Sequence, residues 1–379
     1  MRNPPRHIFI LTTMLCTPLF MACKERPSIP KPDPASGVVS ILDAGHKGQK
    51  TGWWPRMDVD QRGHIHLAYC DVTKGDLRYA YRDDSGWHIE TAVSKGAVGK
   101  YIGIAVDQKS TPAMIFYDQD QKFLRFAKKS ADGTWQSERI AWGLEIGMGG
   151  ELIFDRHNIA HAFYYITSGQ LIHAKQVAPG EWQKRPLADA IGSFTVRISV
   201  KEYKDSFWIS YMDWDLRNSR LYLGKLDGDQ FHAEKVADRL SPGWRSYLFF
   251  VDDEPQIIFT QSVKSQMRWA KRNASGWESQ LINDNTGNFS AYHEPKKNIL
   301  YIAYEDYGIG FRGSNIRLLK YTNKAWQHLL IDPEGPAGTY IDLAVHNNTE
   351  MVLAYYAEPI HGLRIYEEGL QAKSNEQKR

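Results

Sequence analysis

The chain has 379 residues, of which 42% are hydrophobic and 24% are charged, and this balance excludes a wholly disordered protein. Its 47 basic and 44 acidic residues leave a net charge of +3, too small for the basic face that non-specific binding of nucleic acid requires, so no nucleic-acid partner is expected. The 12 Trp, 20 Tyr and 15 Phe, together with 30 Gly and 17 Pro, favour β-structure with many turns.

Residues 1–22 are predicted to be a secretory signal peptide. Arg2 and Arg6 precede an apolar run over residues 8–21, which is shorter than the roughly 20 residues that a bilayer span requires. The segment Leu19-Phe-Met-Ala-Cys23 resembles the lipobox of bacterial lipoproteins, and this resemblance implies that Cys23 is lipidated. The alternative is an ordinary cleaved signal followed by an incidental cysteine. Lys24, in place of Asp, implies by the same resemblance that the lipoprotein is exported to the cell envelope and anchored in the outer membrane.

Residues 23–36 are expected to form an extended tether, because four prolines fall between Lys24 and Ser36. Membrane contact would then occur through the lipid anchor only. Beyond the tether, Cys70 is the one remaining cysteine, so the sequence predicts no disulfide within the folded part and no cysteine-rich metal site.

The rest of the chain repeats one unit seven times. Each unit contains a strand with an aromatic residue that serves as an anchor, and successive anchors are separated by 47, 48, 47, 48, 45 and 51 residues. These anchors are Tyr69, Phe116, Tyr164, Tyr211, Phe259, Tyr304 and Tyr355. Four short strands in a unit of this length are typical of a β-propeller blade.

The predicted fold is therefore an all-β, seven-bladed β-propeller over residues 37–369, with four antiparallel strands per blade. The seventh unit stops after three strands, and residues 37–42 supply an extra strand before the first unit. Pairing this N-terminal strand with the last blade would close the ring and cover two strand edges. Residues 370–379 are expected to be a disordered tail, and the protein is expected to be a monomer.

The candidate ligand site is predicted on the variable-loop face, which carries the loops after each second strand and the loops that lead into each inner strand. Aromatic rings beside carboxylates suit a sugar, since rings stack on its CH-rich faces while carboxylates accept from its hydroxyls. Arginines near the starts of inner strands would favour a ligand with a carboxylate. The candidate ligand-binding residues are Trp53, Trp54, Arg56, Tyr101, Asp120, Arg197, Trp214, Asp215, Trp244, Arg245, Tyr307 and Tyr340.

Residues that recur with the repeat also have a structural interpretation. The recurring tryptophans are expected to pack between strands, and the acids that close the second strands are expected to cap turns. These residues are Trp87, Trp135, Trp182, Trp277 and Trp326, and Asp71, Asp118, Asp213 and Asp306. His64 and His66 are expected on the same face of a strand, as metal ligands could be. His161 repeats the position of His66, which favours a structural role, so no metal is predicted.

No cofactor is predicted either. Gly308-Ile-Gly-Phe-Arg-Gly313 matches the letters of a dinucleotide-binding loop. It falls between two strands with no helix after it, so the geometry that holds a phosphate is not expected.

The turn-plus-Trp elements, such as Ser130-Ala-Asp-Gly-Thr-Trp135, resemble those of bacterial propellers with sialidase-type repeats and of seven-bladed propeller lectins. Asp and Trp are two residues closer here than in the sialidase Asp-box. The resemblance covers residues 37–368 and implies a lectin-like function.

The leading functional hypothesis is an envelope-anchored protein that binds a carbohydrate. One alternative is a scaffold that binds envelope proteins, so the expected partner is a glycan or an envelope protein. Another is a glycoside hydrolase or lyase, which would need two carboxyls about 5 Å apart for retention or about 6.5–9.5 Å apart for inversion. The candidate catalytic acids for that alternative are Asp118, Asp213, Asp215, Glu305 and Asp306.

Overall fold

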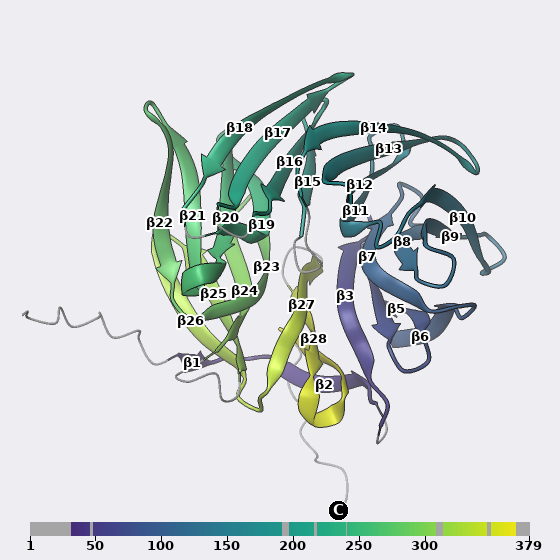
Figure 1. The fold of residues 1–379 in the computed structure, drawn as a ribbon. Helices are drawn as coiled ribbons and strands as arrows, with labels where there is room; N and C mark the ends of the chain where they lie inside the picture. Colours follow the sequence, from purple (N-terminus) through teal and green to yellow (C-terminus); the bar gives the residue numbers. More distant parts are fainter. Residues whose placement is uncertain are drawn as a thin grey trace, which may run out of the picture. The chain divides into compact units, whose positions relative to one another are not determined.

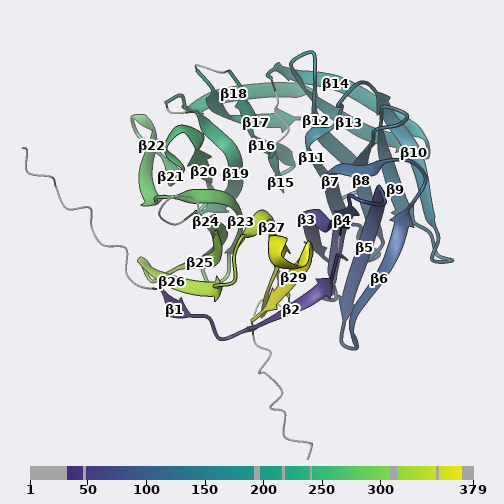
Figure 2. The same cartoon turned by 60° about the horizontal axis from the view of Figure 1, so that its bottom comes forward.

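A computed structural model describes residues 32–45, 48–191, 197–215, 218–239, 241–307, 314–346 and 350–368. Cys23 and the signal segment, most of the tether, the Gly308–Gly313 loop and residues 370–379 lie outside the described residues. The described chain forms seven sheets, arranged as blades in a ring (Figures 1 and 2). Each blade has four antiparallel strands, and one blade carries an additional short parallel strand. The prediction of a seven-bladed β-propeller is confirmed.

The strands follow one another blade by blade, and the inner strand comes first in each. Blade 1 contains β3 (Thr51–Val59), β4 (Ile65–Asp71), β5 (Asp76–Asp83) and β6 (Gly86–Val93). Blade 2 contains β7 (Val98–Val106), β8 (Pro112–Asp118), β9 (Phe123–Lys129) and β10 (Trp135–Trp142). Blade 3 contains β11 (Met148–Phe154), β12 (Ala160–Ile166), β13 (Gln170–Ala178) and β14 (Glu181–Asp189). Blades 4 and 5 contain β15 (Ser199–Tyr203), β16 (Ser206–Asp213), β17 (Arg220–Asp227) and β18 (Gln230–Ala237), then β19 (Pro242–Val251), β20 (Glu254–Gln261), β21 (Gln266–Asn273) and β22 (Gly276–Asn283), with a 3₁₀ turn at Ser262–Lys264. Blades 6 and 7 contain β23 (Thr286–Glu294), β24 (Ile299–Asp306), β25 (Asn315–Thr322) and β26 (Ala325–Asp332), then β27 (Ala337–His346), β28 (Glu350–Ala357) and β29 (Gly362–Glu367), with a 3₁₀ turn at Glu358–Ile360.

The N-terminal strand closes the ring as the sequence predicts. Strand β2 (Val38–Asp43) pairs antiparallel with β29, beginning with Val38 opposite Glu367, and supplies the fourth strand of blade 7. Figure 2 shows these two strands, from opposite ends of the chain, side by side. The Asp43 carboxylate also accepts a hydrogen bond from the Tyr69 hydroxyl of blade 1 at 2.7 Å. The first described residues therefore link the last blade to the first.

Part of the expected tether is bound to the propeller. Strand β1 (Asp33–Pro34) lies parallel to β26, the outer strand of blade 6, with Asp33 opposite Leu329. The Ala35 amide donates to the Leu330 carbonyl oxygen at 3.0 Å. Proline is tolerated here because an edge strand does not use all of its amides.

The core lies between neighbouring blades, and second strands such as β4 and β8 are buried along their whole length. Two of the recurring tryptophans hold neighbouring outer strands together by the same contact. The Trp135 indole donates to Glu90 of the preceding blade at 2.7 Å, and the Trp182 indole donates to Glu138 at 2.7 Å. Trp135 and Trp182 therefore join successive outer strands by equivalent contacts, whereas the buried indole nitrogens of Trp87 and Trp277 have no such partner among the described residues.

Candidate functional site in the central channel

Two cavities lie along the axis of the propeller, where the seven inner strands meet. The entrance cavity, of 290 Å³, is lined by the first residues of the inner strands on the variable-loop face. The channel chamber, of 580 Å³, is lined by the later residues of the same strands. Arg197 and Arg245 line both cavities and form the boundary between them.

The entrance cavity brings together half of the ligand-binding residues that the sequence predicted. They are Trp54, Arg56, Tyr101, Arg197, Arg245 and Tyr340. The cavity also contains Lys100 and Asn288, which the sequence analysis did not select.

A shared backbone distortion shapes the rim of this cavity in blades 1 and 2. Trp54 and Tyr101 both have a φ of 55°, a left-handed conformation that bulky residues rarely adopt. The pairing register of β3 with β4 shifts between Trp53 and Arg56, and that of β7 with β8 shifts between Lys100 and Gly103. Such bulges redirect the side chains that follow them. Because of this distortion, aromatic and cationic side chains of β3 and β7 line the cavity. In regularly paired strands, the same side chains would face the neighbouring blades.

The aromatic wall consists of Trp53, Trp54, Tyr340 and Tyr356. The Trp54 ring centre lies 5.5 Å from that of Trp53 and 5.4 Å from that of Tyr340. Trp53 lies against Tyr340 at 5.2 Å and Tyr356 at 5.9 Å, and its indole nitrogen is buried. Trp53 therefore supports the wall from behind, and Trp54 and Tyr340 present it to the cavity.

Three arginines from different blades converge beside this wall. Arg56 donates to the carbonyl oxygens of Ile102 at 3.0 Å and Gly150 at 3.3 Å, and so bridges blades 1, 2 and 3. Arg197 forms an ion pair with Asp342 at 2.8 Å. The backbones of Arg197 and Arg245 meet in a parallel bridge, which places the two residues side by side.

The positive charge of this cluster is incompletely compensated. Arg245 donates to the Asn288 side-chain oxygen at 2.9 Å, and no carboxylate among the described residues forms an ion pair with it. Burial, followed by the neighbouring Arg197 charge, lowers the pKa of Arg245 to about 10. Glu305 is held behind the cavity by the Asn288 amide at 3.0 Å, and burial raises its pKa. An anionic ligand group would relieve this repulsion.

The other predicted ligand-binding residues do not line either cavity. Trp214 and Trp244 are partly buried and pack against the hydrophobic core that extends over blades 2 to 4. Asp120 accepts from the Ala97 amide at 3.0 Å. The Tyr307 ring lies against Gly287, where a Cβ would meet it at 2.6 Å, and the Asp215 amide lies 3.0 Å from the Ser219 hydroxyl. Trp214 and Trp244 break the sequence repeat and nevertheless contribute to packing.

The candidate catalytic acids fall in three blades: Asp118 in blade 2, Asp213 and the nearby Asp215 in blade 4, and the adjacent Glu305 and Asp306 on β24 of blade 6. The Asp118 carboxylate accepts from the Gln121 amide at 3.0 Å and pairs with Arg125 at 3.3 Å, which is the turn-capping role. Asp306 pairs with Arg317 at 2.7 Å. Asp213 accepts from the Ile191 amide at 3.1 Å. With Asp118 in blade 2, Asp213 in blade 4 and Asp306 in blade 6, these carboxylates serve local structure.

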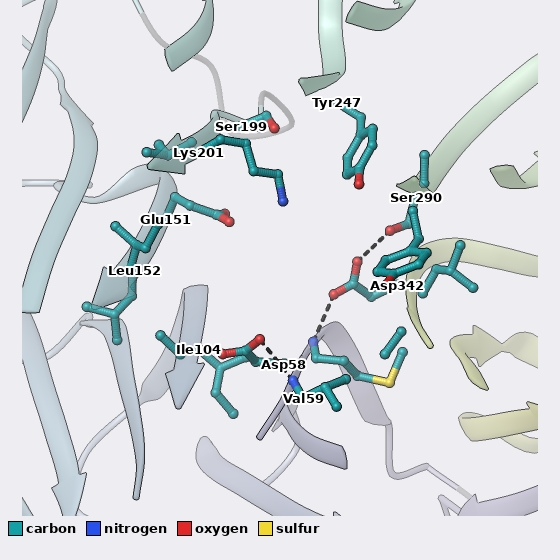
Figure 3. Close-up of a pocket in the computed structure, with 18 of the residues that line it drawn as sticks. Asp58, Val59, Ile104, Glu151, Leu152, Ser199, Lys201, Tyr247, Ser290 and Asp342 are labelled. Carbon is teal, nitrogen blue, oxygen red and sulfur yellow. Dashed lines mark hydrogen bonds between the residues drawn. The ribbon is translucent and has the colours of Figure 1, made fainter. Parts of the chain in front are cut away.

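Apart from Asp60, which caps the turn after β3, the channel chamber contains four charged residues that sequence reasoning missed: Asp58, Glu151, Lys201 and Asp342. Figure 3 shows their side chains around the chamber. Each interrupts an inner strand at a position where most repeats have an uncharged residue, and that interruption was the available signal.

Two of these acids accept hydrogen bonds from backbone amides on the inner strand of the neighbouring blade. Asp58 accepts from the Val106 amide of blade 2 at 2.7 Å, and Asp342 accepts from the Met57 amide of blade 1 at 2.8 Å. Burial raises the pKa of Asp58 to about 6. The Glu151 side chain keeps 26% of its surface accessible, but the channel walls desolvate the carboxyl, and its pKa rises to about 8.

Within the described residues, no group of three His, Cys, Asp or Glu side chains is placed to hold a metal ion. His66 is buried, and its Nδ1 lies 2.6 Å from the Tyr79 hydroxyl. No helix in the described part of the chain has the length and apolar character to cross a membrane.

No protein-family model matches the sequence, and no curated protein matches it. Among solved structures, the chain is similar to the endosialidase of phage phi92, at 11% identity and a TM-score of 0.54, over 88% of this chain and 69% of that one. It is also similar to the SapL1 lectin, solved in complex with α-methyl fucoside, at 11% identity and a TM-score of 0.51, over 76% of this chain and 99% of the lectin. The Hadza microbial sialidase Hz136 matches at 14% identity and a TM-score of 0.48, over 84% of this chain and 66% of that one. The chain thus spans about two thirds of the length of the endosialidase and of the sialidase. The likeness to the endosialidase and to the lectin shows the propeller fold.

Proposed function

We propose that this protein binds an acidic glycan in the entrance cavity and is held in the cell envelope by a lipid on Cys23. The observation that carries the first part is the aromatic wall beside three converging arginines. Trp54 and Tyr340 offer ring faces for stacking on a sugar. Arg197 and Arg245 offer guanidinium groups, which pair with a carboxylate through two parallel hydrogen bonds.

The charge balance of the cavity favours a sugar that carries a carboxylate over a neutral one. Arg197 is paired with Asp342, whereas Arg56 has Glu151 at 3.6 Å and Arg245 has a neutral amide. A carboxylate placed between Arg197 and Arg245 would reduce their mutual repulsion in a desolvated place. A neutral sugar would leave that repulsion unchanged.

The structural neighbours support this proposal by analogy of fold. The SapL1 lectin binds α-methyl fucoside and the phi92 protein is an endosialidase, so propellers of this kind are used for glycans. At 11% identity no individual residue can be transferred from either protein. The proposed site therefore depends on the residues of this chain.

A glycan-binding screen with neutral and carboxylate-bearing sugars tests the proposal. We expect the protein to bind carboxylate-bearing sugars selectively. Arg245→Gln should weaken that binding about tenfold, since one charge-assisted contact is lost. Tyr340→Leu should weaken it several-fold through lost stacking.

The matched control is Arg220→Gln, because Arg220 lies on β17, away from both cavities, and pairs with Asp213 at 3.6 Å. Melting curves should show that all three variants remain folded. A parent protein that binds no acidic glycan, or an Arg245→Gln variant that binds as the parent does, would contradict the proposal.

The proposed anchoring follows from the lipobox resemblance around Cys23 and from the apolar segment before it. Cys23→Ala should move the protein from the membrane fraction to the soluble envelope fraction. Cys70→Ala is the control, because Cys70 is buried in blade 1 and should not affect partitioning. Membrane association that persists in Cys23→Ala would refute the assignment.

A further inference from the structure

Beyond the glycan site, we propose that the channel chamber binds a small zwitterion, a molecule that carries both an ammonium group and a carboxylate. The chamber lies on the other side of the arginine boundary from the entrance cavity. Its volume of 580 Å³ falls within the range of about 300–1,000 Å³ that is usual for small-molecule sites.

The chamber presents opposite charges that do not neutralise each other by contact. Lys201 on β15 and Glu151 on β11 extend into it from neighbouring blades (Figure 3). In the part of the chain that the structure describes, Lys201 forms no ion pair, and its ammonium lies 5.3 Å from the Tyr247 ring centre. Glu151 has Arg56 at 3.6 Å, beyond hydrogen-bond distance. A cationic and an acidic group therefore retain bonding capacity in the same cavity.

The other acids of the chamber wall are already engaged: Asp58 accepts from the Val59 and Val106 amides, Asp60 accepts from the Arg62 and His64 amides, and Asp342 is held by three contacts. Its oxygens accept from the Met57 amide at 2.8 Å, the Ser290 hydroxyl at 2.7 Å and Arg197 at 2.8 Å. This arrangement forms a fixed wall, and it leaves Lys201 and Glu151 as the groups that a ligand could engage.

The pattern of charge selects the class of occupant. A simple cation would be opposed by Lys201 and the two boundary arginines. A simple anion would be opposed by Asp58 and would keep Glu151 protonated. A zwitterion can direct its ammonium to Glu151 and its carboxylate to Lys201, so that each of these side chains gains an oppositely charged contact.

The protonation of Glu151 supports this arrangement. Desolvation raises its pKa to about 8, with Lys201 acting to lower it and Asp342 and Asp58 acting to raise it. A ligand ammonium would stabilise the ionised carboxylate. Binding at neutral pH should therefore release protons.

Calorimetric titration of the full-length protein with glycine, β-alanine and 4-aminobutyrate tests the proposal, because these zwitterions differ in the separation of their charges. Ethylamine and propionate are the single-charge controls. We expect at least one zwitterion to bind, with a proton release that changes with the buffer, and each single-charge probe to bind about tenfold more weakly or not at all.

Lys201→Met and Glu151→Gln should each weaken zwitterion binding by about tenfold. Lys225→Met is the matched control, because Lys225 lies on β17 over the Trp208 ring and should leave binding unchanged. Glu151→Gln preserves side-chain shape and keeps the test valid if Lys201→Met is destabilised. Absence of binding by all three zwitterions, equal binding of a single-charge probe, or parent-like binding by Glu151→Gln would overturn the proposal.

This test is separable from that of the glycan site. Tyr340→Leu alters the entrance cavity alone and should leave zwitterion binding intact. Lys201→Met alters the chamber alone and should leave glycan binding intact.

Discussion

Replacing Asp342 with Ala should destabilise the propeller more than most single substitutions, because this carboxylate joins four blades. Asp342 lies on β27 of blade 7 and is 2% exposed. It accepts from Met57 of blade 1 at 2.8 Å, Ser290 of blade 6 at 2.7 Å and Arg197, at the start of blade 4, at 2.8 Å.

The size of the effect follows from these three contacts. The Met57 and Ser290 hydrogen bonds are worth about 1 kcal/mol each, and the charge-assisted bond from Arg197 about 2 kcal/mol. The Arg197 side chain is 20% exposed, so water can replace only part of what it loses. Asp342→Ala should therefore cost about 4 kcal/mol, Asp342→Asn about half of that, and the control Ser290→Ala about 1 kcal/mol.

Thermal unfolding monitored by tryptophan fluorescence measures this ranking. At about 2 °C per kcal/mol for a domain of this size, Asp342→Ala should lower Tm by about 8 °C and Ser290→Ala by about 2 °C. A Tm for Asp342→Ala as close to the parent as that of Ser290→Ala would show that Asp342 does not join the blades energetically. Equal losses for Asp342→Ala and Asp342→Asn would show that the charge on Arg197 is the dominant contribution.

Three further predictions concern ring closure, pH and the blade contacts. Deletion of Val38–Leu42 removes the strand that pairs with β29, so it should lower Tm and promote aggregation through the exposed edge, and light scattering during melting checks this. The pKa of Glu151 is raised in the folded protein, so its contribution to stability is full below its unfolded pKa near 4.5 and is lost as the pH rises toward 8. Urea midpoints across that window should fall with pH in the parent and fall less in Glu151→Gln, and parallel profiles would contradict the shift. Glu138→Ala should cost about 1–2 kcal/mol in urea unfolding, because Glu138 accepts from the Trp182 indole at 2.7 Å and the Gly180 amide at 2.6 Å, whereas Glu181→Ala, at an exposed position on β14, should have little effect.

Much of the fold is determined by local sequence. Each blade repeats an alternating apolar strand and a short turn, five of the seven add an outer-strand Trp, and these signals act within about 47 residues. Counting the aromatic anchors was therefore enough to predict seven blades, and the incomplete seventh unit was enough to predict that residues 38–42 close the ring. These features can be predicted from the sequence because the strands of a blade are neighbours both along the chain and in the sheet.

The arrangement of the site was decided by tertiary structure alone. The ring brings equivalent positions of distant repeats to one axis, so that Asp342 meets the amide of Met57 across 285 positions of sequence. Which inner-strand side chains line the channel depends on register, since a shift of one residue turns a side chain to the other face. The bulges after Trp53 and Lys100 make that shift, and no periodic pattern announces them. Sequence could therefore identify Trp54, Arg197 and Arg245 as candidates by type and position. The convergence of the arginines, the packing of Trp244 against the core, and the placement of Glu151 and Lys201 in one chamber exist only once seven blades close around a common axis.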